Sequence, residues 1–138
     1  MSVVTKVRLS GSNWGSVEHD LTDMIINQKG IRVLIACGSG YQATSEVFRL
    51  LQGVTKLADE KQVSSTTRKS YNYGTFVSFS NGSYIEARSS RSDYINYDDF
   101  DHFFDIYNEN SKRWSLTNRK CLELEKRVFV PDEDTEFF

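Results

Sequence analysis

The chain has 138 residues, of which 38% are hydrophobic and 13% aromatic, a composition that indicates one globular domain over residues 1–138 and excludes a disordered chain. A net charge of −2 excludes a protein that nucleic acid attracts over its whole surface. No apolar run approaches the roughly 20 residues of a membrane span, and the start of the chain lacks an apolar signal segment, so we expect a cytoplasmic protein with no membrane partner.

The first elements are expected to be a strand, a loop and a helix. Residues 5–10 alternate apolar and polar side chains, which predicts a short strand, and Gly, Ser and Asn make residues 11–16 a loop. Residues 17–28 place apolar side chains at helical spacing. Ser16 is the expected N-cap of that helix.

A buried strand and a second helix are expected next. Residues 31–37 form a short apolar run that is rich in β-branched side chains, typical of a parallel strand covered on both faces. Residues 41–57 repeat apolar side chains at helical spacing. Residues 58–70 are polar and predict an exposed connection.

A hairpin is the clearest local prediction in the second half. Residues 74–89 hold two apolar runs around Asn81 and Gly82, both of which would need a positive φ in a tight turn. Residues 93–100 predict a further strand that runs into a turn, and the spacing of aromatic residues predicts a helix over residues 100–114. Residues 121–130 fit either element, and residues 131–138 predict an acidic, flexible tail.

The order of these elements predicts the fold class. Strands and helices alternate through the first half of the chain, which favours an α/β fold with parallel strands at the centre of a sheet flanked by helices, and with an added β-hairpin. In this order the loop at residues 11–16 lies where a β–loop–helix phosphate cradle would lie.

Two segments resemble a known family. Residues 32–48 are similar to the second strand and helix of the N-terminal ATPase domain of tailed-phage large terminase, the DNA-packaging motor, and residues 79–99 resemble its hairpin and Walker B strand. The resemblance spans roughly residues 5–105. It implies a P-loop-NTPase-like sheet, truncated or degenerate, and a phage or mobile-element setting in the host cytoplasm.

The resemblance also implies a nucleotide site that has degenerated. Gly11 and Gly15 match turn glycines of the Walker A loop, but Ser16 stands where the phosphate-binding Lys belongs. Asp98 matches the metal-directing carboxylate, and Asp99 stands in the position of the water-activating Glu. Losing the Lys removes a charge-assisted contact to the transferred phosphate, so ATP hydrolysis is not expected.

Asp98 and Asp99 have two other interpretations, a helix N-cap with a first-turn acid and an acidic surface that binds a partner. The second would use an acid-aromatic surface whose carboxylates imitate a row of phosphates and whose tyrosines anchor the interface. Its members are Tyr94, Tyr97, Asp98, Asp99, Asp101, Asp105 and Tyr107.

A basic segment over residues 112–127 offers candidate phosphate contacts at Arg113, Arg119 and Lys120, although such a run is more often a solvated face. With only two His residues and two Cys residues in the chain, no metal site is expected, and no residue is assigned a catalytic role.

Three functions remain open. The first is a catalytically degenerate, terminase-like protein that binds a protein partner such as a component of a packaging motor. The second is an anti-defence or host-takeover inhibitor that uses the acid-aromatic surface. The third is a minimal nucleotide-dependent DNA enzyme. No cofactor is expected except Mg-ATP in the third case. The expected partner is a protein, and the basic segment over residues 112–127 leaves nucleic acid open as a second partner.

Overall fold

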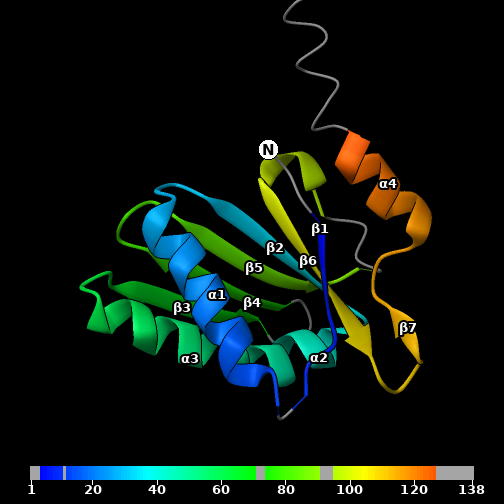
Figure 1. Cartoon of the computed structure of the whole chain (residues 1–138), viewed down its shortest axis with the longest axis horizontal. Coiled ribbons are helices and arrows are strands. Elements are labelled where there is room, and N and C mark those ends of the chain that lie inside the picture. Colours follow the sequence, from blue (N-terminus) through cyan, green and yellow to red (C-terminus); the bar gives the residue numbers. More distant parts are fainter. Residues whose placement is uncertain (1–3, 11, 71–73, 91–94, 127–138) are drawn as a thin grey trace, which may run out of the picture.

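Figure 1 shows a computed structural model of the chain, which describes residues 4–10, 12–70, 74–90 and 95–126. It is an α/β fold with a mixed seven-stranded sheet flanked by helices, as predicted. The strands are β1 (Val4–Val7), β2 (Arg32–Cys37), β3 (Ser65–Ser70), β4 (Gly74–Phe79), β5 (Tyr84–Ser89), β6 (His102–Asn108) and β7 (Arg113–Trp114). The helices are α1 (Trp14–Asn27), α2 (Gly40–Thr44), α3 (Glu46–Glu60), the 3₁₀ turn η1 (Tyr97–Asp99) and α4 (Asn118–Lys126).

The strands follow the order β1-β6-β2-β5-β4-β3 across the sheet, and β7 pairs with the end of β6. The first four are parallel, with Ile35 of β2 opposite Phe104 on one side and Ala87 on the other. β4 and β3 continue the sheet in antiparallel pairing. The carboxyl ends of β1, β6, β2 and β5 therefore lie along one edge of the sheet.

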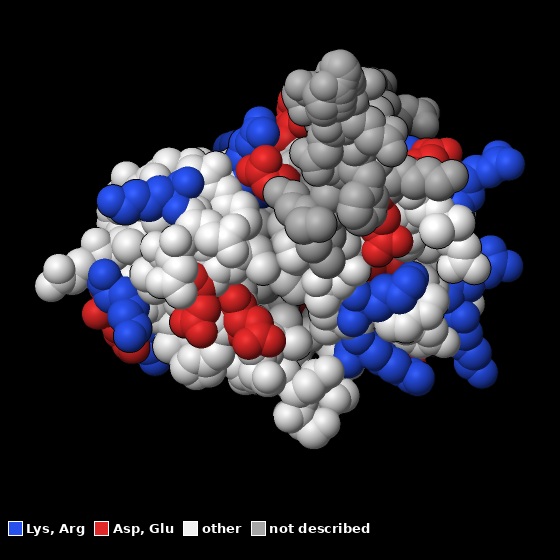
Figure 2. Space-filling view, turned by 45° about the horizontal axis from the view of Figure 1, so that its top comes forward, with Lys and Arg blue, Asp and Glu red and all other residues white. Residues whose placement is uncertain are grey.

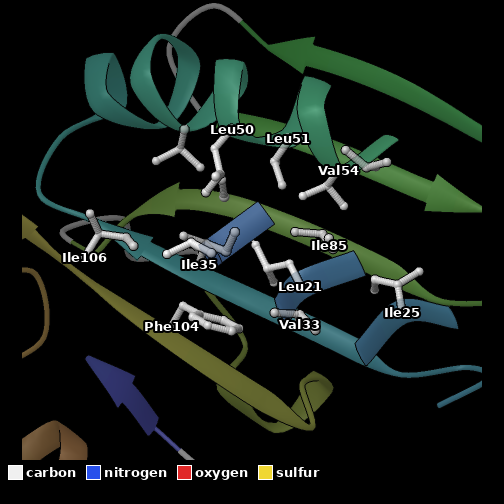
Figure 3. Packing of buried hydrophobic residues seen from close by; sticks show 14 of the residues in the cluster. Leu21, Ile25, Val33, Ile35, Leu50, Leu51, Val54, Ile85, Phe104 and Ile106 are labelled. Atoms are coloured by element: carbon white, nitrogen blue, oxygen red, sulfur yellow. The ribbon is translucent and has the colours of Figure 1, made fainter. Parts of the chain in front are cut away.

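Helices cover both faces of the parallel strands. Leu21 of α1 and Leu50 of α3 pack with Val33 and Ile35 on one face, as Figure 3 shows. On the other face, Leu124 of α4 packs in the cluster of Leu34 and Phe103. Apolar burial on both faces explains why residues 31–37 form a continuous apolar run, and the prediction of a buried parallel strand is confirmed.

The connections between parallel strands pass over opposite faces. The chain moves from β1 across β6 to β2 through α1, and it returns from β5 across β2 to β6 through the segment with η1. Parallel crossovers are right-handed, so connections that run in opposite directions must lie on opposite faces. None of the described helices has the length and apolar composition that crossing a bilayer requires.

The predicted helix over residues 41–57 is two helices, because the chain breaks at Ser45 between α2 and α3. The prediction that residues 58–70 form an exposed connection is wrong. α3 continues to Glu60, and Ser65–Ser70 form β3 at the end of the sheet. Strand β3 is polar because its middle residues are exposed, so its sequence lacks the apolar alternation that identifies a strand.

The hairpin of β4 and β5 is confirmed, but its turn differs in detail. The loop holds residues 80–83, and the Gly82 amide donates to the Phe79 carbonyl. Gly82 has a φ of 89°, whereas Asn81 does not have a positive φ. Instead, the Asn81 side chain accepts from the Ser83 amide and donates to the carbonyl of Ile25 in α1, so it joins the turn to that helix.

Two further predictions are wrong. Residues 95–100 are not a strand, because they contain the 3₁₀ turn η1. Residues 93 and 94 lie outside the described part of the chain. The helix predicted over residues 100–114 is β6 and β7. Phe103 and Phe104 are both buried because they face opposite sides of a covered sheet, and such a pair imitates part of a helical pattern.

Candidate functional site

The carboxyl edge of the parallel strands is the first place to look for a site. In open α/β sheets, ligands bind beyond the carboxyl ends of the strands, where neighbouring connections leave on opposite faces. The chain leaves β1 and β2 toward the face of α1 and α3, and it leaves β5 and β6 toward the face of α4. Arg8, Gly38, Ser90 and Glu109 follow these strands and meet along this edge.

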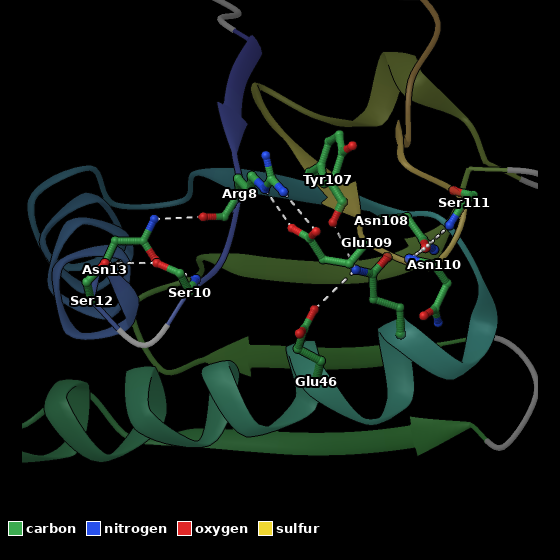
Figure 4. A network of polar contacts seen from close by, with 11 residues as sticks. Arg8, Ser10, Ser12, Asn13, Glu46, Tyr107, Asn108, Glu109, Asn110 and Ser111 are labelled. Carbon is green, nitrogen blue, oxygen red and sulfur yellow. Dashed lines mark hydrogen bonds and ion pairs between the residues drawn. The ribbon is translucent and has the colours of Figure 1, made fainter.

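The loop between β1 and α1 is closed by its own hydrogen bonds (Figure 4). The Asn13 side chain accepts from the Ser10 amide at 2.9 Å and donates to the Arg8 carbonyl at 2.8 Å. The amides of Asn13 and Trp14 both donate to the Ser10 carbonyl. These amides are therefore turned inward, whereas a phosphate cradle needs amides that point at the ligand.

An ion pair stands beside this loop. Arg8 Nε lies 2.7 Å from Glu109 Oε2, and Arg8 Nη2 lies 2.9 Å from Oε1, so the contact is bidentate. These hydrogen bonds hold the pKa of Glu109 below its ordinary value and raise the pKa of Arg8. Glu109 is thus the carboxylate at the end of β6 that faces the β1–α1 loop, and a cation of the same chain already neutralises it.

The structure does not bring the predicted nucleotide site together. Gly15 and Ser16 are the second and third residues of α1, so Gly15 is a helical glycine and Ser16 is not the N-cap, a position that Asn13 occupies. Gly11 lies outside the described residues. Asp98 and Asp99 precede β6 and stand at the amino edge of the sheet, opposite the β1–α1 loop, because β1 and β6 are parallel.

Asp98 and Asp99 are first-turn acids of η1, as one interpretation expected, but neither is a helix N-cap, and β6 rather than a helix follows them. The Asn96 side chain caps this turn by accepting from the Asp98 amide. Nearby, Asp101 accepts from the backbone amide and the guanidinium of Arg32. Partial burial alone would raise the pKa of Asp101, but the hydrogen bonds from Arg32 outweigh it and lower that pKa.

The acid-aromatic surface is divided in the same way. Asp105 is fully buried beneath α4, where it accepts from Lys6 at 2.8 Å and from the Leu116 amide at 2.9 Å. Tyr107 stands at the carboxyl edge, with the Arg8 guanidinium 4.5 Å from its ring centre. Tyr94 lies outside the described residues. The six described residues of the predicted surface therefore do not form one surface.

The predicted phosphate contacts lie on the other side of the carboxyl edge. Arg113 and Lys120 line a pocket of about 300 Å³ together with Gly38, Ser90, Tyr97 and Trp114; we call it the Trp114 pocket. Arg119 is exposed on α4 beside it. In the face that Figure 2 shows, Lys and Arg side chains gather at the right, where Figure 1 places β7 and α4.

The sequence did not indicate a second hollow, which we call the Tyr41 groove. It has a volume of about 690 Å³ and is lined by Gly40, Tyr41, Thr44, Ser45, Phe48, Arg49 and Lys69. Two residues could have indicated this groove in the sequence. Phe48 does not belong to the buried apolar residues of α3, and Tyr41 does not belong to those of α2. An apolar ring outside the buried stripe of an amphipathic helix indicates a second contact.

Within the described residues, no three His, Cys, Asp or Glu side chains stand close enough to hold a metal ion. Comparisons with protein families, with curated proteins and with solved structures found no match for this chain.

Proposed function

We propose that this chain acts by binding a protein partner in the Tyr41 groove and that it does not hydrolyse nucleotide. The observation that carries the proposal is the exposure of Tyr41, whose surface is 78% accessible at the rim of the groove of about 690 Å³. Kinship with terminases, a P-loop-like ancestry and a phage setting stay predictions from the sequence.

An exposed tyrosine on a rigid rim is suited to anchor a protein interface. Tyr41 lies in α2, which the Ser39 side chain caps by accepting from the Gln42 amide at 3.1 Å. The Thr75 hydroxyl on β4 donates to the Ala43 carbonyl and fixes α2 to the sheet. Tyrosine offers a large contact area for two rotatable bonds, and interfaces concentrate their binding energy in such residues.

The charges of the groove select an acidic partner. Arg49 and Lys69 are the charged side chains of its lining, and both are exposed. The Lys69 ammonium lies 4.4 Å from the centre of the Phe48 ring, which leaves an apolar floor under a positive rim. A peptide segment with an aromatic or aliphatic side chain between carboxylates complements this arrangement.

The segment would lie beside β3, to which Lys69 belongs. β3 ends the sheet, and its outer edge pairs with no other described strand. An extended peptide can add its backbone hydrogen bonds to such an edge while its side chains enter a neighbouring groove. We therefore propose an extended, acidic segment of a partner protein as the occupant.

The proposal that nucleotide is not hydrolysed is supported by the β1–α1 loop. The amides of Ser10, Asn13 and Trp14 are bound within the loop. No Lys stands at its junction with α1, and Glu109 is paired with Arg8. Phosphoryl transfer needs cations and amide donors around the γ-phosphate, together with a carboxylate that directs the metal. In the described part of the loop the cation is missing, and the Ser10, Asn13 and Trp14 amides and the Glu109 carboxylate already have partners.

A peptide-display selection tests the proposal. The wild-type chain is the bait. Peptides that also bind the double variant, which carries both Tyr41→Ala and Arg49→Gln, are removed from the selection. We expect acidic peptides with an aromatic or aliphatic residue, whose affinity in fluorescence anisotropy falls at least about tenfold in Tyr41→Ala. The matched control is Leu122→Ala on α4, because Leu122 is another exposed large side chain, at 59%.

A selection in which every enriched peptide also binds the double variant, so that none survives the subtraction, would contradict the groove as the site. Hydrolysis is tested separately by phosphate release from Mg-ATP. We expect the rate of the buffer alone. A faster release that disappears in Glu109→Gln would contradict the loss of catalysis and leave the groove untouched.

A further inference from the structure

The Trp114 pocket has no role in the proposed peptide binding and lies on the face of α4. Its walls come from three elements at the carboxyl edge: Gly38 after β2, Ser90 after β5, and Arg113 with Trp114 in β7. The Ser90 amide donates to the Cys37 carbonyl at 2.8 Å, so the floor continues the hydrogen bonding of the parallel sheet. The pocket is therefore a feature of the rigid core of the fold.

The charge of this pocket is positive and largely uncompensated. Residues 110–122 contain Lys112, Arg113, Arg119 and Lys120 and no acidic residue. Among the described residues, no carboxylate pairs with Arg113 or Arg119. Lys120 lies 3.2 Å from Glu123, an exposed pair of little strength. An anion that enters the pocket therefore meets Arg113, which pairs with no described carboxylate, and Lys120, whose ion pair is weak.

Two aromatic rings accompany these cations. The Trp114 and Tyr107 rings form a T-shaped pair with their centres 5.1 Å apart, and the Lys6 ammonium lies 4.6 Å from the centre of the Trp114 ring. These contacts fix the indole while 37% of its surface stays exposed. Tyr97 is held against Phe103 at 6.2 Å, with Lys120 above its ring. Both rings are fixed and belong to the lining of the pocket.

We propose that this pocket binds single-stranded nucleic acid. One unpaired base would stack on Trp114, and Arg113 and Lys120 would contact its phosphates. Aromatic platforms combined with cations that follow a backbone are the usual chemistry of single-strand binding. The volume of about 300 Å³ is at the lower end of ligand sites and fits one base rather than a base pair.

A strand fits better than a free mononucleotide because the positive charge continues outside the pocket. Lys112 precedes Arg113 in the turn before β7, and Arg119 is exposed on α4 next to Lys120. Phosphates on either side of the bound base would lie over these two cations. The expected signature is therefore an affinity that depends on the length of the oligonucleotide and on salt.

The test uses fluorescence anisotropy of a labelled twelve-nucleotide oligothymidylate with the full chain. Arg113→Gln with Lys120→Gln should weaken binding at least about tenfold. It should also reduce the slope of log affinity against log salt by about 1.4, because each phosphate contact on a single strand contributes about 0.7. The charge-matched control is Lys29→Gln with Lys61→Gln, two exposed lysines that follow α1 and α3.

Stacking has its own readout. Trp114 is the one tryptophan left in a Trp14→Phe background, so oligothymidylate should quench its fluorescence as it saturates the anisotropy signal. Trp114→Ala should weaken binding about tenfold, with folding checked by thermal unfolding. The proposal would be overturned if the two double variants bound with equal affinity or if the oligonucleotide did not quench Trp114. It would also be overturned if thymidine monophosphate bound as tightly as the oligonucleotide, or if a duplex of equal length bound more tightly.

Discussion

Lys6 and Asp105 form an ion pair between neighbouring parallel strands, with Nζ 2.8 Å from Oδ2. Asp105 is fully buried, whereas the Lys6 side chain is 38% exposed. Burial alone would lower the pKa of Lys6, but the hydrogen bond and charge of Asp105 raise it. The Leu116 amide and the Cys121 thiol also donate to Asp105, so this carboxylate fixes the segment that leads into α4.

Removing Lys6 should destabilise the fold more than removing Arg8 does. Lys6→Met leaves a buried carboxylate without its cation, and we expect a loss of about 2 to 3 kcal/mol in the free energy of unfolding at pH 7, measured by urea denaturation. Arg8→Met breaks an exposed pair and should change it far less. Lys6→Met combined with Asp105→Asn should recover part of the loss, because Asn carries no charge and its side-chain oxygen can still accept from the Leu116 amide. A double variant less stable than Lys6→Met would contradict this account.

Gly15 and Gly82 should respond in opposite directions to substitution by Ala. Gly15 lies in α1 and has no atom near an added Cβ, so Gly15→Ala should stabilise the fold by about 0.5 kcal/mol. Gly82→Ala forces a φ of 89° on a residue with a side chain and should destabilise by about 1 kcal/mol. Urea denaturation measures both. A destabilised Gly15→Ala would instead support a turn glycine at this position.

The elements that could be predicted from the sequence are those whose pattern is local. Residues 31–37 identified β2 because both of its faces are covered, and the hairpin was identified by Asn81 and Gly82. The periodicity of α3 was found in the same way. Each pattern lies within about 16 residues of sequence, so no knowledge of the partner strands or helices was needed.

The groups at the carboxyl edge of the sheet could not be predicted, because their proximity depends on the order of the strands. Arg8 and Glu109 are 101 residues apart and meet because β6 enters the sheet between β1 and β2. Assigning residues 93–100 to a strand and residues 100–114 to a helix displaced Asp98 and Asp99 to the wrong edge. Phe103 is covered by α4, which lies later in the chain, so the sequence around β6 did not reveal a strand that is buried on both faces.

Restoring the missing lysine should not restore a nucleotide site. Ser16→Lys places a cation in the first turn of α1, but the Ser10 and Asn13 hydrogen bonds still turn the loop amides inward. We expect no increase in melting temperature with Mg-ATP for either wild type or Ser16→Lys. A nucleotide at a hundredfold excess over its dissociation constant would add about 2.7 kcal/mol of stability. A clear shift in Ser16→Lys alone would show that the lysine was the one missing part.

Stability should fall as the pH rises above about 9, with Cys37 as one cause. Full burial raises the pKa of the Cys37 thiol above its ordinary value of 9.0. The folded chain therefore keeps this proton while the unfolded chain releases it, so the contribution is fully present below pH 9.0 and is lost as the pH rises toward the folded pKa. Cys37→Ala removes the effect, and its deficit relative to wild type should shrink by about 1 kcal/mol between pH 9 and pH 10. The control is Val33→Ala, a core truncation on the same strand with no titrating group, whose deficit should stay constant; a Cys37→Ala deficit equally constant with pH would contradict the assignment.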